Sequence, residues 1–259
     1  MTTRRAWDDL ARPVLRDGLH VVRRDDRHLQ LGLDPPDRLV LDDRPGLHAA
    51  LTHLDRRPPA ELREVVSELV AEGWVVDAGD RGRSPDAASA RPPVALTVDA
   101  MLEDPVLRVC SAAGVTRATE SPVRLVATVG EPRRAVSDAL VRDDVAHLWL
   151  AVLPDAVRIG PFVEPGRSSC LRCVDAHLGD QDPRRATVLH QLEDLPSAPL
   201  TDPDPCLVRL AVAWAVRDVV RRLDGREPAL RSATVTVTAD LEVTHRAWLR
   251  HPHCGCAWG

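Results

Sequence analysis

The sequence contains no lysine, so all 34 of its Lys-plus-Arg side chains are arginines. A P-loop nucleotide hydrolase needs a lysine to hold its phosphates, and Schiff-base or pyridoxal chemistry needs an amine nucleophile. The absence of lysine therefore excludes all three classes.

Long apolar runs and a basic charge balance are missing as well. The longest apolar candidate, residues 207–216, is interrupted by Arg209 and falls short of the roughly 20 residues that span a bilayer. Residues 1–10 are charged and have no apolar signal core. The formal net charge of −5 does not suit a general nucleic-acid binder. We therefore expect a cytoplasmic protein with neither a membrane nor a nucleic acid as its partner.

A change of composition divides the chain of 259 residues. Residues 79–93 (GDRGRSPDAASARPP) are rich in Gly, Pro, Ser and charge and show no apolar period, which is typical of a linker. The sequence thus predicts one domain over residues 1–78 and a second over residues 94–259.

The first domain has a pattern of strands followed by helices. Short apolar or alternating segments at 19–23, 28–33 and 38–41 are separated by turn residues and predict a three-stranded meander. Apolar residues at helical spacing over 47–54 and 62–70 predict two helices, and a last short strand is expected at 74–76. This order is typical of a small winged-helix domain.

The second domain alternates strands and helices. Strands are expected at 94–98, 123–129, 147–153, 156–159, 232–238 and 242–248, and helices at 101–113, 133–141 and 204–223. Asp204 is the expected N-cap of the last helix, and Pro205 its first residue. The pattern predicts an α/β layer with an antiparallel end.

The most specific signal is the spacing of four cysteines. Cys170 and Cys173 form a CxxC pair, and Cys254 and Cys256 form a CxC pair at the end of the sequence. Two close thiolate pairs in a cytosolic chain indicate a closed, structural zinc site that clips the tail to the middle of the second domain. Gly255 is expected to let the backbone turn between the last two ligands.

Other interpretations of these residues stay open. The four thiols can instead be buried or redox-active cysteines, because redox motifs share the CxxC spacing. His251 and His253 flank the second pair, and either can replace a cysteine as ligand. Cys110 and Cys206 lie in apolar helical stretches and are interpreted as core residues. A four-thiolate site has no open position for catalysis, and we identify no catalytic residues elsewhere.

Several segments resemble one family of bacterial proteins. The matching segments are residues 159–173 (IGPFVEPGRSSCLRC), then Asp175, His177 and 180–183 (DQDP), the closing 251–256 (HPHCGC), and near the start 12–19 (RPVLRDGL) and 30–36 (QLGLDPP). They resemble the actinobacterial ThiF-like, ubiquitin-activating-enzyme-like proteins of bacteriocin cyclodehydratase systems, which bind the leader peptides of azole-modified precursors. The two early segments resemble that family's PqqD-like recognition element.

The resemblance implies a winged-helix PqqD-like domain fused to a Rossmann-type, ThiF-like domain. In adenylating relatives a glycine-rich turn after the first strand accepts the phosphates of ATP. Here Asp99 follows that strand, and no glycine occurs between Arg83 and Gly114. We therefore expect a degenerate domain that does not bind ATP and has no catalysis of its own, with no cofactor-binding residues beyond the metal ligands.

The resemblance thus implies the function of a scaffold that presents a precursor peptide to a YcaO-type cyclodehydratase. A leader peptide would add a strand to a sheet edge and place apolar side chains beside a helix. The best candidates for this groove are Leu39 and Leu41 on the strand and Leu62, Val65 and Leu69 on the helix. The alternative for each of these residues is an ordinary place in the core.

Three other functions stay open. The chain can be an adenylyltransferase or sulfur-transfer relative of ThiF that still binds ATP, a regulatory or assembly protein without a peptide substrate, or a thiol redox protein. By analogy with ThiF-like folds, a homodimer is an expected assembly.

Overall fold

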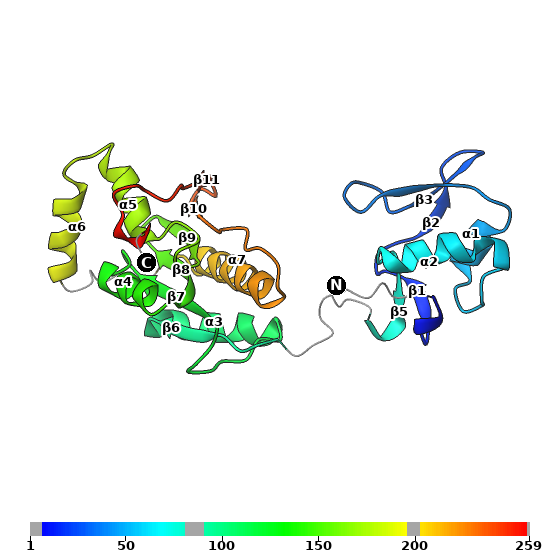
Figure 1. Ribbon diagram of the computed structural model, residues 1–259, viewed down its shortest axis with the longest axis horizontal. Coiled ribbons are helices and arrows are strands. Elements are labelled where there is room, and N and C mark those ends of the chain that lie inside the picture. Colours follow the sequence, from blue (N-terminus) through cyan, green and yellow to red (C-terminus); the bar gives the residue numbers. More distant parts are fainter. Residues whose placement is uncertain (1–6, 81–90, 196–202, 258–259) are drawn as a thin grey trace. The chain divides into compact units, whose positions relative to one another are not determined.

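The computed structural model describes residues 7–80, 91–195 and 203–257 (Figure 1). The chain divides by its internal contacts into two compact units, Met1–Ser89 and Ala90–Gly259. Most of the predicted linker falls on residues 81–90, which lie outside the described residues.

The first unit contains the predicted three-stranded meander. Its strands are β1 (Pro13–Leu15), β2 (Val21–Arg23), β3 (His28–Leu31), β4 (Leu39–Asp42) and β5 (Val75–Asp77). Its helices are α1 (Leu47–Thr52) and α2 (Arg63–Ala71), with 3-10 turns η1 (Trp7–Asp9), η2 (Ala60–Leu62) and η3 (Ala78–Asp80). Strands β2, β3 and β4 form one antiparallel sheet, and β5 pairs with β1 instead. The last strand is as predicted, but its partner β1 was not, because three residues are too short to show a period.

The core of the first unit lies between its sheet and its helices. Leu29 and Leu31 from β3 are fully buried, and the apolar face of α2 packs with them and with Leu47 and Leu51 of α1. The buried apolar residues of α2 recur three and four positions apart, and this spacing predicted the helix.

The second unit is built around a six-stranded mixed sheet. Its strands are β6 (Ala95–Val98), β7 (Val123–Val129), β8 (Ala146–Val152), β9 (Ala156–Val163), β10 (Ala233–Thr238) and β11 (Val243–Ala247). Its helices are α3 (Ala100–Ala112), α4 (Arg134–Arg142), α5 (Leu171–Gly179), α6 (Arg185–Asp194) and α7 (Pro205–Leu223), with a 3-10 turn η4 (Gly255–Ala257). Helices α5 and α6 were not expected from the sequence.

The order of the strands across the sheet is β11-β10-β9-β8-β7-β6. Strands β6, β7 and β8 are parallel and are joined through α3 and α4, whereas β9, β10 and β11 continue the sheet with antiparallel pairs. This confirms the predicted α/β layer with an antiparallel end.

Both faces of this sheet are covered, because successive side chains of a strand point to opposite faces. On one face, Leu125 and Leu148 belong to a cluster that α3 and α7 complete. On the other face, Val126 and Trp149 pack with residues of α4, α5 and the chain's end. The tail thus reaches the same side of the sheet as α4 and α5.

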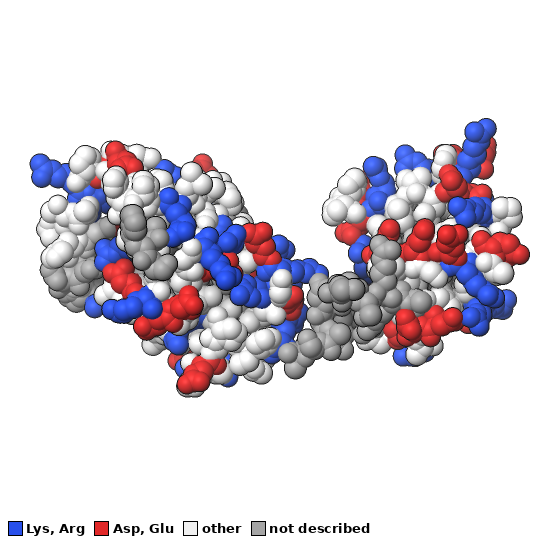
Figure 2. All heavy atoms as spheres, in the orientation of Figure 1, with Lys and Arg blue, Asp and Glu red and all other residues white. Residues whose placement is uncertain are grey.

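Helix α7 packs on β7, β8 and β9 and, with α3, covers the face of the sheet that carries Leu125 and Leu148. Its start is as predicted, because Asp204 accepts hydrogen bonds from the backbone N–H groups of Cys206 and Leu207 and Pro205 begins the helix. None of the described helices is both long enough and apolar enough to cross a lipid bilayer. On the face seen in Figure 2, arginines and acidic side chains are intermixed over both units.

Candidate metal centre

Two cysteine pairs that are far apart in the sequence come together in the second unit. Cys170 is the N-cap of α5 and Cys173 lies in its first turn, while Cys254 and Cys256 lie at the end of the described chain. The four sulfur atoms lie within 4.8 Å of one another and could hold a metal ion.

The distances between the sulfurs fit one ion with four thiolate ligands. The Sγ atoms of Cys170 and Cys173 are 3.9 Å apart, those of Cys170 and Cys254 3.6 Å, and those of Cys173 and Cys256 3.4 Å. A tetrahedral zinc site with Zn–S bonds of about 2.3 Å has sulfurs about 3.8 Å apart. A disulfide would need about 2 Å, so none is formed, and all four cysteines are free.

The local electrostatics favour the thiolate form of Cys173 and disfavour the thiolate forms of Cys170 and Cys254. A hydrogen bond from the Cys170 thiol lowers the pKa of Cys173 to about 4, aided by the backbone N–H of His251. That same bond raises the pKa of Cys170, and burial raises the pKa of Cys254 to about 12. Four thiolates at these distances repel one another, so a divalent cation is what allows all four to ionise.

Contacts outside the cysteines also hold the tail in place. The Trp248 indole N–H donates to Thr234 Oγ1 of β10 at 2.9 Å, and Arg250 donates to the carbonyl of Cys256 within the tail at 3.2 Å. The His251 ring contacts Asp180, with Nε2 and Oδ2 3.1 Å apart, and its Nδ1 accepts the backbone N–H of His253. Neither histidine ring joins the four sulfurs as a ligand in this geometry.

The remaining cysteines divide between core and surface. Cys110 is buried in the cluster under α3, as expected. The prediction for Cys206 is wrong, because its side chain is exposed in the first turn of α7, whereas the neighbouring Leu207 and Val208 face the core. The expected role of Gly255 is also not required, because its φ is not positive and a Cβ there would meet nothing within 4 Å.

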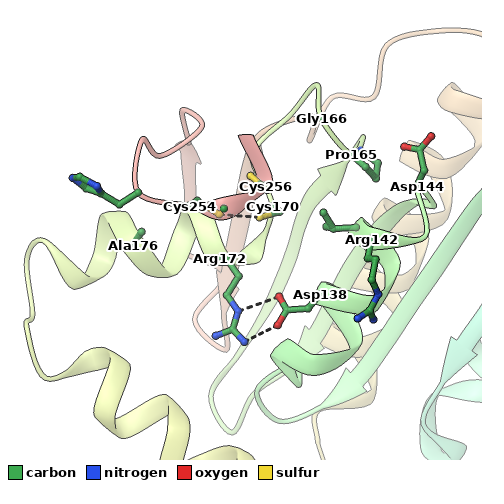
Figure 3. A pocket seen from close by; sticks show the side chains of 13 residues that line it. Asp138, Arg142, Asp144, Pro165, Gly166, Cys170, Arg172, Ala176, Cys254 and Cys256 are labelled. Atoms are coloured by element: carbon green, nitrogen blue, oxygen red, sulfur yellow. Dashed lines mark hydrogen bonds and ion pairs between the residues drawn. The ribbon is translucent and has the colours of Figure 1, made fainter. Parts of the chain in front are cut away.

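An open pocket of about 960 Å³ lies beside the cysteines (Figure 3). Cys170, Cys254 and Cys256 line it together with α4 and α5, and Arg172 forms an ion pair with Asp138 beside it at 2.7 Å. Cys256 is only partly buried. Solvent, ions and chelators can therefore reach the cysteine group through this opening.

A second charged group, which the sequence did not predict, fixes the middle of α5. Arg134 is buried and donates to both oxygens of Asp175 at 2.8 Å, and it also pairs with Glu131 at 2.8 Å. Arg158 donates a hydrogen bond to Glu131 Oε2 at 2.6 Å, and Arg185 donates one to Asp175 Oδ1 at 3.1 Å. These five residues form what we call the ion network. Glu131 and Arg134 are neighbours at the start of α4, but Arg158, Asp175 and Arg185 come from three other elements, so no local sequence signal could have found the network.

Mutual neutralisation stabilises the charged forms in the ion network. Burial would lower the pKa of Arg134, but the hydrogen bonds and charges of Asp175 and Glu131 raise it. Burial would raise the pKa values of Glu131 and Asp175, but the neighbouring arginines hold both below their ordinary values. The network therefore stays ionised at neutral pH without any added ion.

The junction between β6 and α3 does not fit the phosphates of a nucleotide. Strand β6 ends at Val98 and α3 begins at Ala100, so Asp99 alone connects them. The Asp99 carboxylate accepts the backbone N–H of Val129 at 2.7 Å. Phosphate binding at such a junction needs free N–H groups and glycine, whereas this one carries an acidic side chain and no glycine.

The residues predicted for a peptide groove are placed in the first unit. Leu62, Val65 and Leu69 are buried in its core cluster, and Leu39 and Leu41 of β4 pack partly against that cluster. Val40, between the two leucines, points outward and is 41% exposed.

Strand β4 has an edge with no partner among the described residues, because it pairs only with β3. The Asp43 N–H donates to the Arg27 carbonyl, and the register sets Gln30 opposite Val40. Hydrogen-bonded and non-bonded pairs alternate in an antiparallel ladder. Counting from Arg27 and Asp43, Val40 is in a non-bonded pair, so its N–H and carbonyl face the open edge.

Comparison with solved structures shows the fold to be that of known proteins. The chain matches the heterocyclase TruD over 95% of its own length and 42% of TruD, with 18% identity and a TM-score of 0.72. It matches a heterocyclase in complex with substrate and cofactor over 95% and 39% of the two chains, with 14% identity and a TM-score of 0.73. MccB from E. coli, solved with AMPCPP and MccA, matches over 95% and 99% of the two chains, with 10% identity and a TM-score of 0.65.

The chain spans about two-fifths of the length of the heterocyclases that it matches, but nearly the whole of MccB. No protein-family model matches the sequence, and no curated protein does. At these identities the likeness is one of fold, a mixed α/β architecture.

Proposed function

We propose that this chain is a non-catalytic, peptide-binding scaffold of a ribosomal peptide modification system of the thiazole or oxazole type. It binds the leader of a precursor peptide in the cytoplasm and presents the peptide to a YcaO-type cyclodehydratase. The fold shared with heterocyclases over 95% of this chain, combined with a β6–α3 junction that does not fit phosphates, is the observation that carries the proposal.

In this proposal the first unit is a winged-helix, PqqD-like recognition domain of residues 1–78. The leader extends the sheet as a fourth strand beside β4, where the N–H and carbonyl of Val40 face the open edge. Leu39 and Leu41 are partly buried, so apolar leader side chains would settle over them, while Leu62, Val65 and Leu69 would support this surface from the core beneath. Main-chain hydrogen bonds supply affinity, and the apolar contacts select the peptide.

The second unit, residues 94–259, is a degenerate ThiF-like domain with a structural zinc ion. Cys170, Cys173, Cys254 and Cys256 would hold the zinc, because four soft thiolates in tetrahedral spacing are a typical zinc ligand set. A closed four-thiolate site supplies stability and no reactive position. The zinc therefore fixes the tail beside α5 and takes no part in a reaction.

The cyclodehydratase partner is part of the proposal because segments of this chain resemble proteins of cyclodehydratase systems. TruD, which this chain matches over 42% of TruD's length, is a heterocyclase. A homodimer of this chain remains part of the proposal by analogy.

Reconstitution tests the proposal. The YcaO-type enzyme encoded beside this chain is incubated with its precursor peptide and ATP, with and without the chain. Ring formation is measured by mass spectrometry as the loss of water from the peptide. We expect the chain to raise the rate of ring formation for the full precursor and to have no effect on a precursor without its leader. Equal rates with and without the chain would contradict the scaffold function.

A second candidate function is peptide adenylation. MccB, which matches over nearly all of its length, has been solved with ATP. Release of pyrophosphate from ATP by this chain and its precursor would favour that function. We expect no release, because Asp99 occupies the junction where the phosphates would bind.

A further inference from the structure

Three side chains near the tail form a second group of metal-ligand type. The ligand atoms of His177, Asp180 and His251 lie within 4.8 Å of one another. His177 is in the last turn of α5 and Asp180 is its C-cap, so the two lie on one face of the helix. His251 comes from the tail, where its position beside the CxC pair suggested only a substitute ligand for the cysteine site. The spacing of a histidine and an aspartate three apart, with a distant histidine, is its only sequence signal.

The contacts of His177 suit a metal ligand. Its Nε2 lies 2.9 Å from the carbonyl oxygen of Leu249. A carbonyl can only accept, so Nε2 carries the proton and the lone pair is on Nδ1. Metal-binding histidines typically hold their other N–H against a carbonyl or carboxylate in this way.

His251 and Asp180 already face each other. Their Nε2 and Oδ2 atoms are 3.1 Å apart, and the rings of His251 and His177 are 4.7 Å apart between centroids. The side chain of His251 is 7% exposed and that of Asp180 is 65% exposed. The group is thus anchored on its buried side and open on the other, which gives an ion a path of entry.

We propose that His177, Asp180 and His251 form a second metal site, which takes a divalent ion of the zinc, cobalt or nickel kind. Two imidazoles and one carboxylate favour these ions over magnesium or calcium, which prefer oxygen ligands throughout. Three protein ligands leave at least one position for water. When the ion binds Nε2 of His251, the ring proton moves to Nδ1, and the 3.2 Å contact with the backbone N–H of His253 is lost.

The two sites would hold the tail along α5 at two points. Cys173 and His177 are four residues apart, so they lie on one side of the helix at a rise of about 6 Å. The tail runs against the helix direction, with Cys254 near Cys170 and His251 near Asp180 (Figure 1). This proposal is independent of peptide binding.

Metal stoichiometry tests the proposal on the full chain. Metal-free protein is titrated with Co²⁺, and binding is followed by calorimetry and by visible absorption. We expect two equivalents. One gives the intense absorption and charge-transfer bands of thiolate ligands, and the other gives only the weak bands of nitrogen and oxygen ligands. Metal analysis of protein loaded with Zn²⁺ and then desalted gives an independent count.

The variants His177→Gln and Asp180→Asn should each bind one equivalent and keep the thiolate bands. The matched control is His245→Gln on the exposed strand β11, which should keep both equivalents. Circular dichroism verifies that each variant is folded. A single equivalent in the unaltered chain would overturn the proposal. It would also be overturned by a second equivalent that survives both substitutions, because this would indicate an adventitious ion elsewhere.

Discussion

The cysteine group and the ion network hold the same helix, α5, by opposite means. At the start of the helix, four thiols lie at distances that suit a shared cation. In the middle of the helix, Asp175 belongs to a network of two acids and three arginines that neutralise one another. The first arrangement depends on an ion from outside the chain, and the second is complete within it.

Because of this difference, the two sites should respond differently to chelators and to substitutions. The cysteine group should respond to chelators, and the ion network should not. Substitution of one residue should destabilise the two sites for different reasons. The cysteine group would lose its metal ion, whereas the ion network would keep a buried charge without its partner.

The largest expected effect is that of metal removal. Chelation, or the substitution Cys173→Ser, should lower the free energy of unfolding of the second unit on the order of 5 kcal/mol, less than the ~10–16 kcal/mol of small zinc domains, because this unit keeps its own apolar core. Thermal unfolding with and without chelator measures the effect. The control is Cys206→Ser, which alters an exposed thiol outside the group. Equal stability of the Cys173 and Cys206 variants would contradict the role of the metal.

The next effect concerns the ion network. Arg134→Met leaves Asp175 and Glu131 buried without their main partner and should cost about 3–5 kcal/mol, with the same loss in the presence of chelator. Urea unfolding gives the value. The double variant Arg134→Met/Asp175→Leu should recover part of the loss, because it removes a buried carboxylate that would keep only Arg185 as its partner. A double variant less stable than the single one would rule out this explanation.

The pH dependence of stability distinguishes the contribution of the ion network from that of a buried histidine. Burial lowers the pKa of His147 to about 4, and its Nδ1–H donates to the Val145 carbonyl. The unfolded chain has a histidine pKa near 6.5, so it takes up the proton first. Stability should fall as the pH drops from about 6.5 to about 4, by about 3 kcal/mol in all.

The variant His147→Gln should lose most of this pH dependence. The ion network should contribute only at the acid end of that window. The pKa values of its carboxylates lie below their ordinary values, so its stabilisation is lost only as the pH falls to the pKa of about 4.5 or less of the same groups in the unfolded chain. Urea unfolding at several pH values measures the dependence. The same slope in the variant would show that another group is responsible.

The smallest effect extends the comparison to the first unit, whose β4 edge relies on neither an ion nor a charge network. Val40→Pro removes an N–H that faces the open edge and should weaken leader binding about tenfold without breaking the pairing with β3. The control is Arg23→Pro on β2, at the opposite edge of the sheet. Anisotropy of a labelled leader measures both. Equal weakening by the two prolines would argue against β4 as the binding edge.

The parts of the fold that follow local patterns could be predicted from the sequence. The meander, helix α7 with its Asp204 cap, and the β10–β11 hairpin all have the right period and the right turn residues. Strand β1 and helices α5 and α6 were missed. β1 is three residues long, and α6 buries only Leu189 among its described side chains, so neither shows a clear apolar stripe.

The candidate site was predictable where residue type alone limits the chemistry. Four cysteines in two pairs have few uses, and so their meeting could be expected. The ion network and the His177 group use residue types that are common on any surface, and only the folded chain brings them together. The prediction that Cys206 lies in the core was wrong, because apolar neighbours in the sequence do not show which face of the helix a residue occupies.

One measurement tests the scaffold proposal most directly. The zinc-loaded chain is titrated into a fluorescently labelled precursor peptide encoded beside its gene, with and without ATP, and anisotropy is recorded. The account predicts saturable binding that requires the leader and is the same with and without ATP. No binding to the leader, or binding only when ATP is present, would contradict it.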